Sequence, residues 1–146
     1  MKQNSVASIV VLFSLFLFGC TKKDEAPNQA AQLASILTAK SWKLSSTVMI
    51  STSGNINQTI QSCKLDDLWE YNSSGKFAKF PGTNKCSSSD LTVLGTWEIV
   101  DNNKGLKVTL SSGGTYTDEI ILLDNSKLQL KFITGTAAYI DTYIPN

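Results

Sequence analysis

Short runs of alternating apolar and polar residues follow one another from Trp42 to the end of the chain. Such alternation is typical of half-buried β-strands. In the first run, every second residue is apolar except for one Ser: Trp42, Leu44, Ser46, Val48 and Ile50. Further strands are expected at residues 56–62, 68–71, 76–80, 94–100, 106–110, 115–123, 128–132 and 137–144. The pattern predicts eight or nine short strands.

The segments between these runs are rich in Gly, Asn, Ser and Thr, as in Asn72-Ser73-Ser74-Gly75. These residues accept left-handed dihedrals or satisfy the backbone locally, so they indicate tight turns. Parallel strands need long crossover connections, and no connecting segment is long enough. An antiparallel meander exposes two edges unless it closes into a barrel. We therefore expect an all-β fold, an antiparallel up-and-down β-barrel of about eight strands. A β-sandwich is the alternative.

One short helix is expected before the strands. Three apolar residues lie at helical spacing within residues 32–40: Leu33, Ile36 and Leu37. A pattern of this kind predicts an amphipathic helix that leads into the domain. The residues before it, 20–31, are mostly polar and are expected to form a flexible tether. The domain itself is then expected over residues 32–146.

Residues 1–19 have the composition of a secretory leader. Lys2 supplies a positive charge, and an apolar run extends from Ile9 to Phe18. That run is about half the length of the roughly 20 residues that a membrane-spanning helix needs. It ends in Gly19-Cys20, which resembles the lipobox at which bacteria cleave and acylate lipoproteins. We expect a lipoprotein signal peptide cleaved before Cys20. A short buried helix or an N-terminal anchor helix is the alternative.

Acylation of Cys20, with palmitate among the acyl chains, would make the membrane a partner of this protein. Each buried methylene of an acyl chain contributes about 0.8 kcal/mol, so several chains anchor a protein permanently. Lys23-Asp24-Glu25 resembles the Lys and two acidic residues that direct many lipoproteins of the Bacteroidota to the outer face of the outer membrane. Charged runs also simply solvate a tether. We expect a lipid-anchored outer-membrane protein, and both surface display and a periplasmic position stay open.

Composition excludes several classes of function. If Lys2 leaves with the signal peptide, 12 Lys face 12 acidic residues, so the domain lacks the basic footprint of a nucleic-acid-binding protein. The chain contains no His, which excludes a Ser-His-Asp triad, a Cys–His pair and a His-ligated zinc site. All 13 basic residues are Lys, so the Arg fork that binds carboxylates and phosphates is missing. We expect neither an enzyme nor a cofactor.

Cys63 and Cys86 remain once Cys20 is assigned to the lipid. An even pair of Cys in an exported domain favours a disulfide, because exported proteins meet an oxidising compartment. The bond would close a loop of about 24 residues and stabilise the fold by roughly 3–4 kcal/mol. A redox site or a metal site is the alternative, although the two Cys lie far apart in sequence and no His accompanies them.

The order of several short motifs resembles the lipocalin-like lipoproteins of the Bacteroidota. The leader and tether are followed by Leu37-Thr38-Ala39-Lys40-Ser41-Trp42-Lys43-Leu44, Cys63 with Asp66-Asp67, Asn72-Ser73-Ser74-Gly75, Cys86 and Gly95-Thr96-Trp97-Glu98-Ile99. In that family the second Gly-x-Trp marks a strand in the middle of the barrel, here Gly95 and Trp97. The first Trp usually follows a Gly, whereas Ser41 precedes Trp42. The resemblance implies a lipocalin-like barrel.

An eight-stranded barrel has an interior just wide enough for packed side chains or one small ligand. The resemblance implies that a small apolar ligand binds there. Seven aromatic residues are candidates to line its site: Trp42, Trp69, Tyr71, Trp97, Tyr116, Tyr139 and Tyr143. The same rings would otherwise fill the core. The alternation leaves both interpretations open, because it does not decide which face of each strand points inward.

Two pairs of acidic residues are candidates for other chemistry. Asp66-Asp67 offers the oxygen ligands that calcium prefers, but it lacks EF-hand spacing and fits a solvated turn. Asp118 and Glu119 lie on opposite faces of one strand, so they do not share a catalytic site. No metal site is therefore expected. The sequence predicts a lipid-anchored binding module; the alternative is a structural or interaction partner in an envelope assembly, with a filled barrel.

Overall fold

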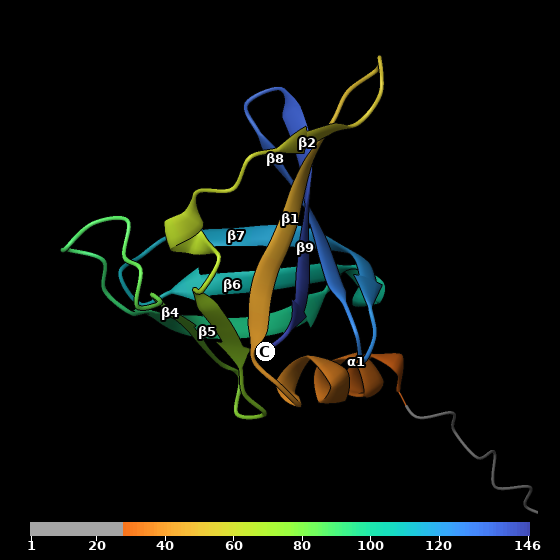
Figure 1. The fold of residues 1–146 in the computed structure, drawn as a ribbon. Helices are drawn as coiled ribbons and strands as arrows, with labels where there is room; N and C mark the ends of the chain where they lie inside the picture. Colours follow the sequence, from red (N-terminus) through yellow and green to blue (C-terminus); the bar gives the residue numbers. More distant parts are fainter. Residues whose placement is uncertain (1–27) are drawn as a thin grey trace, which may run out of the picture.

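The computed structural model describes residues 28–146, which form one closed β-sheet with a helix across one end (Figure 1). The predicted signal peptide, Cys20 and most of the predicted tether lie outside the described residues. The elements are α1 (Gln29–Thr38), β1 (Trp42–Ile50), β2 (Ile56–Gln58), η1 (Ser62–Lys64), β3 (Leu68–Tyr71), β4 (Lys76–Phe80), β5 (Val93–Val100), η2 (Asp101–Asn103), β6 (Gly105–Leu110), β7 (Thr115–Leu123), β8 (Leu128–Thr134) and β9 (Ala137–Pro145). Among residues 28–146, no helix has the length and apolar character needed to cross a membrane.

The sheet is antiparallel throughout, and successive strands pair with one another from β3 to β9. β1 closes the barrel by pairing with β9, from Trp42 opposite Pro145 to Ile50 opposite Ala138. β2 is a short extra strand on the other edge of β1. The predicted up-and-down barrel of about eight strands is confirmed. The β-sandwich is excluded because all nine described strands belong to one closed sheet.

Helix α1 begins three residues before the predicted start at residue 32. Asn28 explains the difference, because its side-chain oxygen accepts a hydrogen bond from the N–H of Ala30 (3.1 Å) and so caps the first turn. The helix lies across the barrel end where β1 starts and β9 ends (Figure 1). There Leu37 is fully buried, and the indole of Trp42 donates a hydrogen bond to the Leu37 carbonyl (3.0 Å). We name this closed end of the barrel the α1 end.

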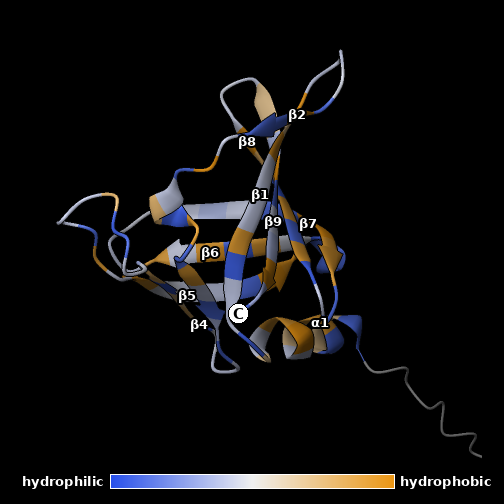
Figure 2. Cartoon of the chain, in the orientation of Figure 1, coloured by the Kyte–Doolittle hydropathy of each residue, from blue (hydrophilic) through white to orange (hydrophobic). Residues whose placement is uncertain are grey.

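The register of the strands shows which side chains face the interior, because paired residues point to the same side of a sheet. Leu106 and Val108 on β6 are almost fully buried. Their partners on β7, Asp118 and Tyr116, therefore face inward. The strands are banded in apolar and polar residues as a result (Figure 2). Next to the α1 end, apolar side chains fill the barrel: Leu37, Trp42, Leu44, Leu106, Val108, Leu123, Leu128 and Leu130.

A β-bulge interrupts β1 between Leu44 and Ser46. A bulge inserts one extra residue, so the side chains that follow it change face. Trp42 and Leu44 face the interior before the bulge, and Thr47, opposite Asp141 on β9, faces the interior after it. The alternation in the sequence predicted a single face along this whole strand. That prediction is wrong beyond Leu44.

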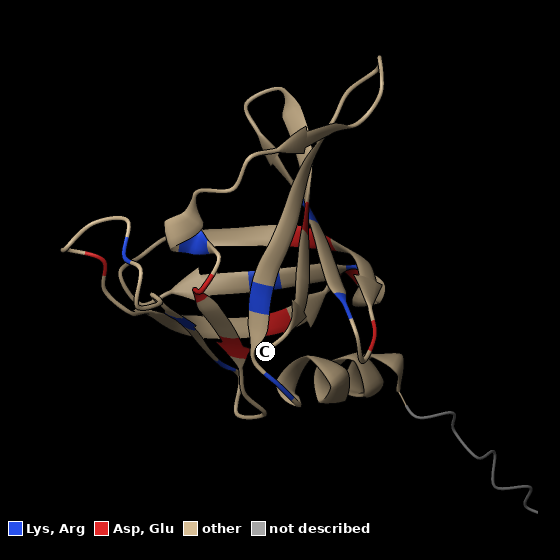
Figure 3. Ribbon diagram, in the orientation of Figure 1, with Lys and Arg blue, Asp and Glu red and all other residues tan. Residues whose placement is uncertain are grey.

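Charged residues of both signs are interspersed over the strands and loops (Figure 3). Lys107 pairs with Glu98 (2.7 Å), and Lys131 pairs with Glu119 (2.9 Å). Exposed ion pairs contribute only about 0–1 kcal/mol each, so they add little to the stability of the barrel. They do fix the orientation of Glu119, which points outward while Asp118 beside it points inward. The two carboxylates lie on opposite faces of β7, as predicted.

Candidate functional site

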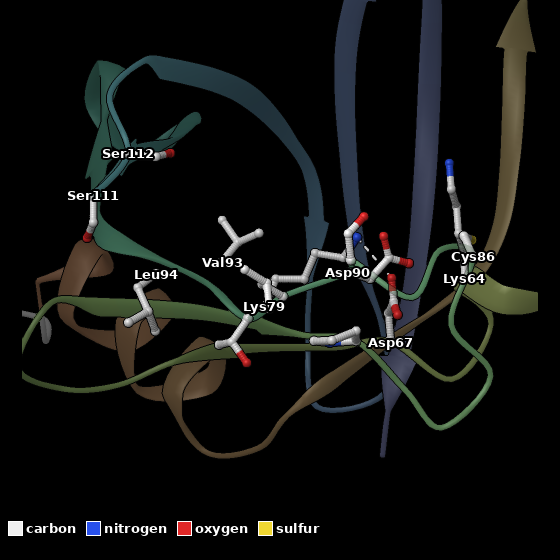
Figure 4. A pocket seen from close by; sticks show the side chains of 13 residues that line it. Lys64, Asp67, Lys79, Cys86, Asp90, Val93, Leu94, Ser111 and Ser112 are labelled. Carbon is white, nitrogen blue, oxygen red and sulfur yellow. Dashed lines mark ion pairs between the residues drawn. The ribbon is translucent and has the colours of Figure 1, made fainter.

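Two hollows open at the barrel end opposite α1. The first has a volume of about 450 Å³ and lies where β1 and β3, which pair only through Trp42 and Trp69, move apart. We name it the β1–β3 pocket; its walls include Leu44, Thr47, Trp69, Phe132 and Asp141. The second, of about 670 Å³, lies between β5 and the loop of residues 81–92 (Figure 4). Lys64 and Lys79 line both hollows, which therefore adjoin.

An ion pair between a buried carboxylate and a partly exposed Lys lies where the two hollows meet. The ammonium of Lys79 lies 2.9 Å from a carboxylate oxygen of Asp67 (dashed line in Figure 4), and it also lies 4.8 Å from the centre of the Trp69 ring. Asp67 accepts a further hydrogen bond from the N–H of Gly82 (3.1 Å). Asp67 is buried, contrary to the predicted solvated turn. Its negative charge neutralises the Lys that faces the barrel mouth.

Asp66, the other half of the predicted calcium candidate, organises the loop. Its carboxylate accepts hydrogen bonds from the N–H of Asn84 (3.0 Å) and the hydroxyl of Thr83 (3.1 Å). The bond from Asn84 contributes most to lowering the pKa of Asp66, because it stabilises the ionised form. In the part of the chain that the structure describes, no group of three or more His, Cys, Asp or Glu could hold a metal ion.

The predicted disulfide between Cys63 and Cys86 is confirmed, with 5.0 Å between the two Cα atoms. It joins η1 to the loop of residues 81–92. Both segments line the hollows, since Cys86 lies in the larger one and Lys64 of η1 lies in both. The bond therefore holds together two walls of the barrel mouth that no strand pairing connects.

The seven predicted aromatic residues divide between core and open interior. Trp42 is fully buried at the α1 end and belongs to the core. Trp69 lines the β1–β3 pocket. Tyr116 faces inward yet is 40% exposed, which shows that the barrel is open to solvent at its level. Tyr71 and Tyr143 also belong to the buried core, and register places Trp97 and Tyr139 on the inner face.

These rings pack against one another around the interior. Trp69 meets Tyr143 edge-on, with 5.1 Å between ring centres. Tyr71 meets Trp97 edge-on at 5.9 Å, and Tyr139 stacks on Phe132 at 5.4 Å. Edge-on and stacked pairs of this kind are the favoured aromatic arrangements. The aromatic rings therefore extend from the core, through Tyr143, into the β1–β3 pocket, where Trp69 and Phe132 form part of the wall.

Two carboxylates face the interior among these rings. Asp141 on β9 accepts hydrogen bonds from the hydroxyls of Thr47 (2.5 Å) and Tyr143 (3.3 Å). Asp118 on β7 lies opposite the buried Leu106 and faces the same space. Within residues 28–146, the Asp118 carboxylate has neither an ion pair nor a hydrogen-bond donor. The two carboxylates thus have different surroundings.

The low polarity of the interior shifts the pKa of each group in it, because burial disfavours the charged form. Burial raises the pKa of Asp118 to about 6, and the charge of Asp141 adds to the effect. Burial also raises the pKa of Asp141, while hydrogen bonds from Thr47 and Tyr143 and the charge of Lys64 act against it. Burial raises the pKa of the Tyr71 and Tyr143 hydroxyls well above their usual value.

Asp118, Asp141 and Thr47 were absent from the predicted site, although the sequence contains a signal for the first two. Asp118 shares its strand face with Tyr116, and Asp141 shares its face with Tyr143. On a barrel strand, an acidic residue two positions from an aromatic residue lies on the same face as that ring. Where the ring faces inward, the acidic residue is a polar group inside the barrel. Thr47 could not be found in this way, because the bulge changes its face.

Comparison with known proteins gives a family match and two similar folds. Residues 38–130 match the family model of a lipocalin-like domain. An uncharacterized protein from Bacteroides eggerthii has 13% sequence identity and a TM-score of 0.52, covering 75% of this chain and 99% of its own. A lipocalin-like protein from Bacteroides uniformis has 12% identity and a TM-score of 0.52, covering 75% and 98%. No curated protein matches the chain. At these identities the two structures show the fold alone.

Proposed function

This chain belongs to the family of lipocalin-like domains, and on that premise we propose that it is a lipid-anchored envelope lipoprotein whose barrel binds a small, mainly apolar molecule. The β1–β3 pocket is the observation that carries the proposal. It has a volume of about 450 Å³ and is open on one side; the apolar side chains of Leu44, Ile60, Trp69 and Phe132 share its walls with seven polar ones, among them Lys64 and Lys79. Small-molecule sites are typically concave spaces of about 300–1,000 Å³, mostly apolar and with a few placed polar groups. Asp141 and Thr47 are such groups.

The α1 end gives some support to the alternative function, a filled barrel that serves as a structural or interaction partner. Trp42 and Leu37 are fully buried there and leave no room for a ligand beside the helix. A ligand would therefore occupy only the half of the barrel that faces the mouth. Binding is the better-supported function, because a barrel filled along its whole length would not keep the β1–β3 pocket open.

The proposed activity is binding without catalysis. General acid–base catalysis relies most often on His, and the chain has none. The interior carboxylates Asp118 and Asp141 face rings and hydroxyls of Tyr and Thr rather than a nucleophile with its base. These surroundings fit recognition of a ligand better than a chemical reaction on it.

The location is proposed from the sequence before residue 28. The apolar run that ends in Gly19-Cys20 supports cleavage and acylation at Cys20, and Lys23-Asp24-Glu25 supports transport to the outer membrane. A Cys20→Ser variant should remain uncleaved or become soluble, and it should incorporate no labelled palmitate. Normal membrane partitioning of that variant would contradict the anchor.

Ligand binding can be tested on the mature protein by native mass spectrometry and by tryptophan fluorescence with a panel of lipids and sterols. Trp69 lies in the pocket wall and should report occupancy directly. Phe132→Ala should weaken binding of any responding compound. Ile133→Ala is the matched control, since this neighbour is 71% exposed on the outer face. Absence of a co-purifying ligand, with fluorescence unchanged by the whole panel, would favour the filled-barrel function.

A further inference from the structure

We infer that the molecule held in this barrel carries a positively charged amine on an apolar body. The inference rests on the proposed binding function and names the chemical class of the ligand. It begins with Asp118 and Asp141, which face the interior from β7 and β9. Neither carboxylate forms an ion pair with a Lys among residues 28–146. The two interior carboxylates therefore have no Lys in direct contact with them, although Lys64 and Lys79 line the same pocket as Asp141.

The hydroxyl of a buried Tyr gives a second observation. Tyr71 is only 4% exposed, and its hydroxyl makes no hydrogen bond within residues 28–146. Register places Tyr71 on the inner face of β3, and its ring meets that of Trp97 edge-on. Burial raises the pKa of the hydroxyl, and the charges of Tyr116 and Asp118 add to the effect. In the described chain, Asp66 Oδ1 is the one fully buried side-chain oxygen or nitrogen without a partner, so the Tyr71 oxygen reaches the open interior. It presents an unused acceptor to the interior that Asp118 also faces.

An ammonium group would supply the donor that Asp118 and Tyr71 lack and the positive charge that both carboxylates lack. It is a donor of three hydrogen bonds and accepts none, which suits the Asp118 carboxylate, the Asp141 carboxylate and the Tyr71 oxygen. Its positive charge removes the unfavourable energy of an ionised carboxylate in surroundings of low polarity. The faces of Trp and Tyr rings attract cations as well. Trp69 and Tyr143 border the same interior.

The remaining charged groups around this space leave its negative sign unchanged. Lys79 is already paired with Asp67. Lys64 acts weakly on Asp141 from η1, at the exposed rim. A fatty acid or another anion would therefore have to place its carboxylate at the rim, because Asp118 and Asp141 repel it from the interior.

A metal ion fits the same residues less well than an amine does. Calcium prefers six to eight oxygen ligands. In the part of the chain that the structure describes, Asp118 and Asp141 gather no third acidic, Cys or His ligand. An ammonium needs only one close carboxylate, and the aromatic wall suits the apolar body of an organic molecule rather than a hydrated ion.

The test uses three small molecules that share one apolar body: 2-phenylethylamine, 2-phenylethanol and phenylacetate. Isothermal titration calorimetry on the mature protein at pH 7.5 measures each dissociation constant. The amine should bind about 10- to 100-fold more tightly than the alcohol, the range expected for one charge-assisted contact. Phenylacetate should bind most weakly of the three. Calcium chloride and zinc chloride, each alone, should give no binding heat that depends on Asp118.

Variants assign the selectivity to named groups. Asp118→Asn and Asp141→Asn should each lower amine affinity about tenfold or more while leaving affinity for the alcohol unchanged. Tyr71→Phe keeps the ring and removes only the hydroxyl, so it should reduce amine affinity severalfold without disturbing the fold. Glu119→Gln is the matched control, because Glu119 neighbours Asp118 but pairs with Lys131 on the outer face. It should leave all affinities unchanged.

The outcomes separate the inference from the function on which it rests. Binding of lipids or sterols without preference for the amine over the alcohol would overturn the amine inference and leave the proposed function standing. Unchanged amine affinity in Asp118→Asn, or a metal that binds through Asp118 in place of the amine, would overturn the inference as well. If no compound of either panel binds, both proposals fail.

Discussion

Asp118 has a carboxylate whose ionised form the folded barrel disfavours. Burial and the charge of Asp141 raise its pKa in the folded protein from 3.8 to about 6. Between about pH 4 and pH 6 the folded state therefore holds this proton while the unfolded chain has lost it. The free energy of unfolding contributed by Asp118 falls as pH rises through that window and is constant above it.

Asp118→Asn should therefore stabilise the ligand-free protein at neutral pH. The gain should be absent below about pH 4 and should reach roughly 1 kcal/mol above pH 6, a figure reduced because the side chain is partly exposed to solvent. Urea denaturation of both proteins from pH 3.5 to 8 measures the difference. Asp66 and Asp124, whose pKa values are lowered, also make stability depend on pH. Their contributions are the same in both proteins and cancel in the difference.

Glu119→Gln serves as the control for that titration, since its exposed ion pair with Lys131 should give at most a small shift. A stability difference between Asp118→Asn and the parent that is the same at every pH would contradict the argument. A site residue that destabilises the unliganded fold is a common consequence of function.

At the scale of single residues, the sequence predicted a bond or a site only where the number of residues of one type, or their alternation along a strand, was sufficient. The even pair of Cys that remained once Cys20 was assigned to the predicted anchor was enough to predict the Cys63–Cys86 bond. Trp69 lies in the wall of the β1–β3 pocket, but its role in lining a ligand site stays a prediction. Asp118 and Asp141 were missed because the interior of a barrel is expected to be apolar. Each nevertheless lies two positions from a Tyr on the same face of its strand.

Among the elements, β5 depends on a residue without a side chain. A Cβ on Gly95 would lie only 2.4 Å from the backbone carbonyl oxygen of Thr109 on β6. Gly95→Ala should therefore lower the free energy of unfolding by about 1–3 kcal/mol, as overpacking of a core usually does. Urea denaturation measures the loss, and Thr96→Ala, at an exposed neighbour on the outer face, is the control. Equal stability of Gly95→Ala and the parent would contradict the close approach.

The disulfide acts between two elements that no ladder joins, η1 and the loop of residues 81–92. The double variant Cys63→Ala, Cys86→Ala should unfold about 2–5 kcal/mol more easily than the parent. Hydrogen exchange should increase chiefly in that loop and in η1, while β8 and β9 near the α1 end keep their protection. Detection of two free thiols in the unfolded, unreduced mature protein would show that the bond does not form.

The elements themselves were more predictable than their boundaries and faces. All nine strands correspond to alternating runs in the sequence, because turn residues separate those runs clearly. The start of α1 was misplaced, since the polar residues that read as tether follow a capping Asn28. The change of face in β1 beyond Leu44 was not predictable, because a bulge leaves no mark in the alternation.

At the scale of the whole molecule, the closure of the sheet into a barrel could be predicted from the sequence, but the pocket at the open end could not. A meander with two free edges gains from pairing its first and last strands, and β1 pairs with β9 accordingly. The β1–β3 pocket arises because β1 meets β3 only at Trp42 and Trp69 and then pairs with β2 instead. That separation depends on the three-dimensional course of several strands, which no local pattern contains.

The two ends of the barrel also differ in their relation to the proposed anchor. Asn28 precedes α1 directly, so an anchor at Cys20 would be joined to the closed α1 end by a chain that spans at most about 30 Å. Both hollows open at the opposite end. On a membrane, the α1 end should then face the lipid and the mouth should face the aqueous phase, from which a ligand would enter.

Single Cys substitutions on the two ends can test this orientation. Ser35→Cys lies on the exposed side of α1, and Ile133→Cys lies near the β8–β9 turn at the mouth end. Labelling by a bulky maleimide should be slower for Ser35→Cys on vesicles bearing the acylated protein than in its soluble Cys20→Ser form. Ile133→Cys should be labelled equally fast in both, because the bilayer is at the far end of the barrel. Slower labelling of Ile133→Cys alone would place the mouth against the membrane, and the ligand would then have to come from the lipid.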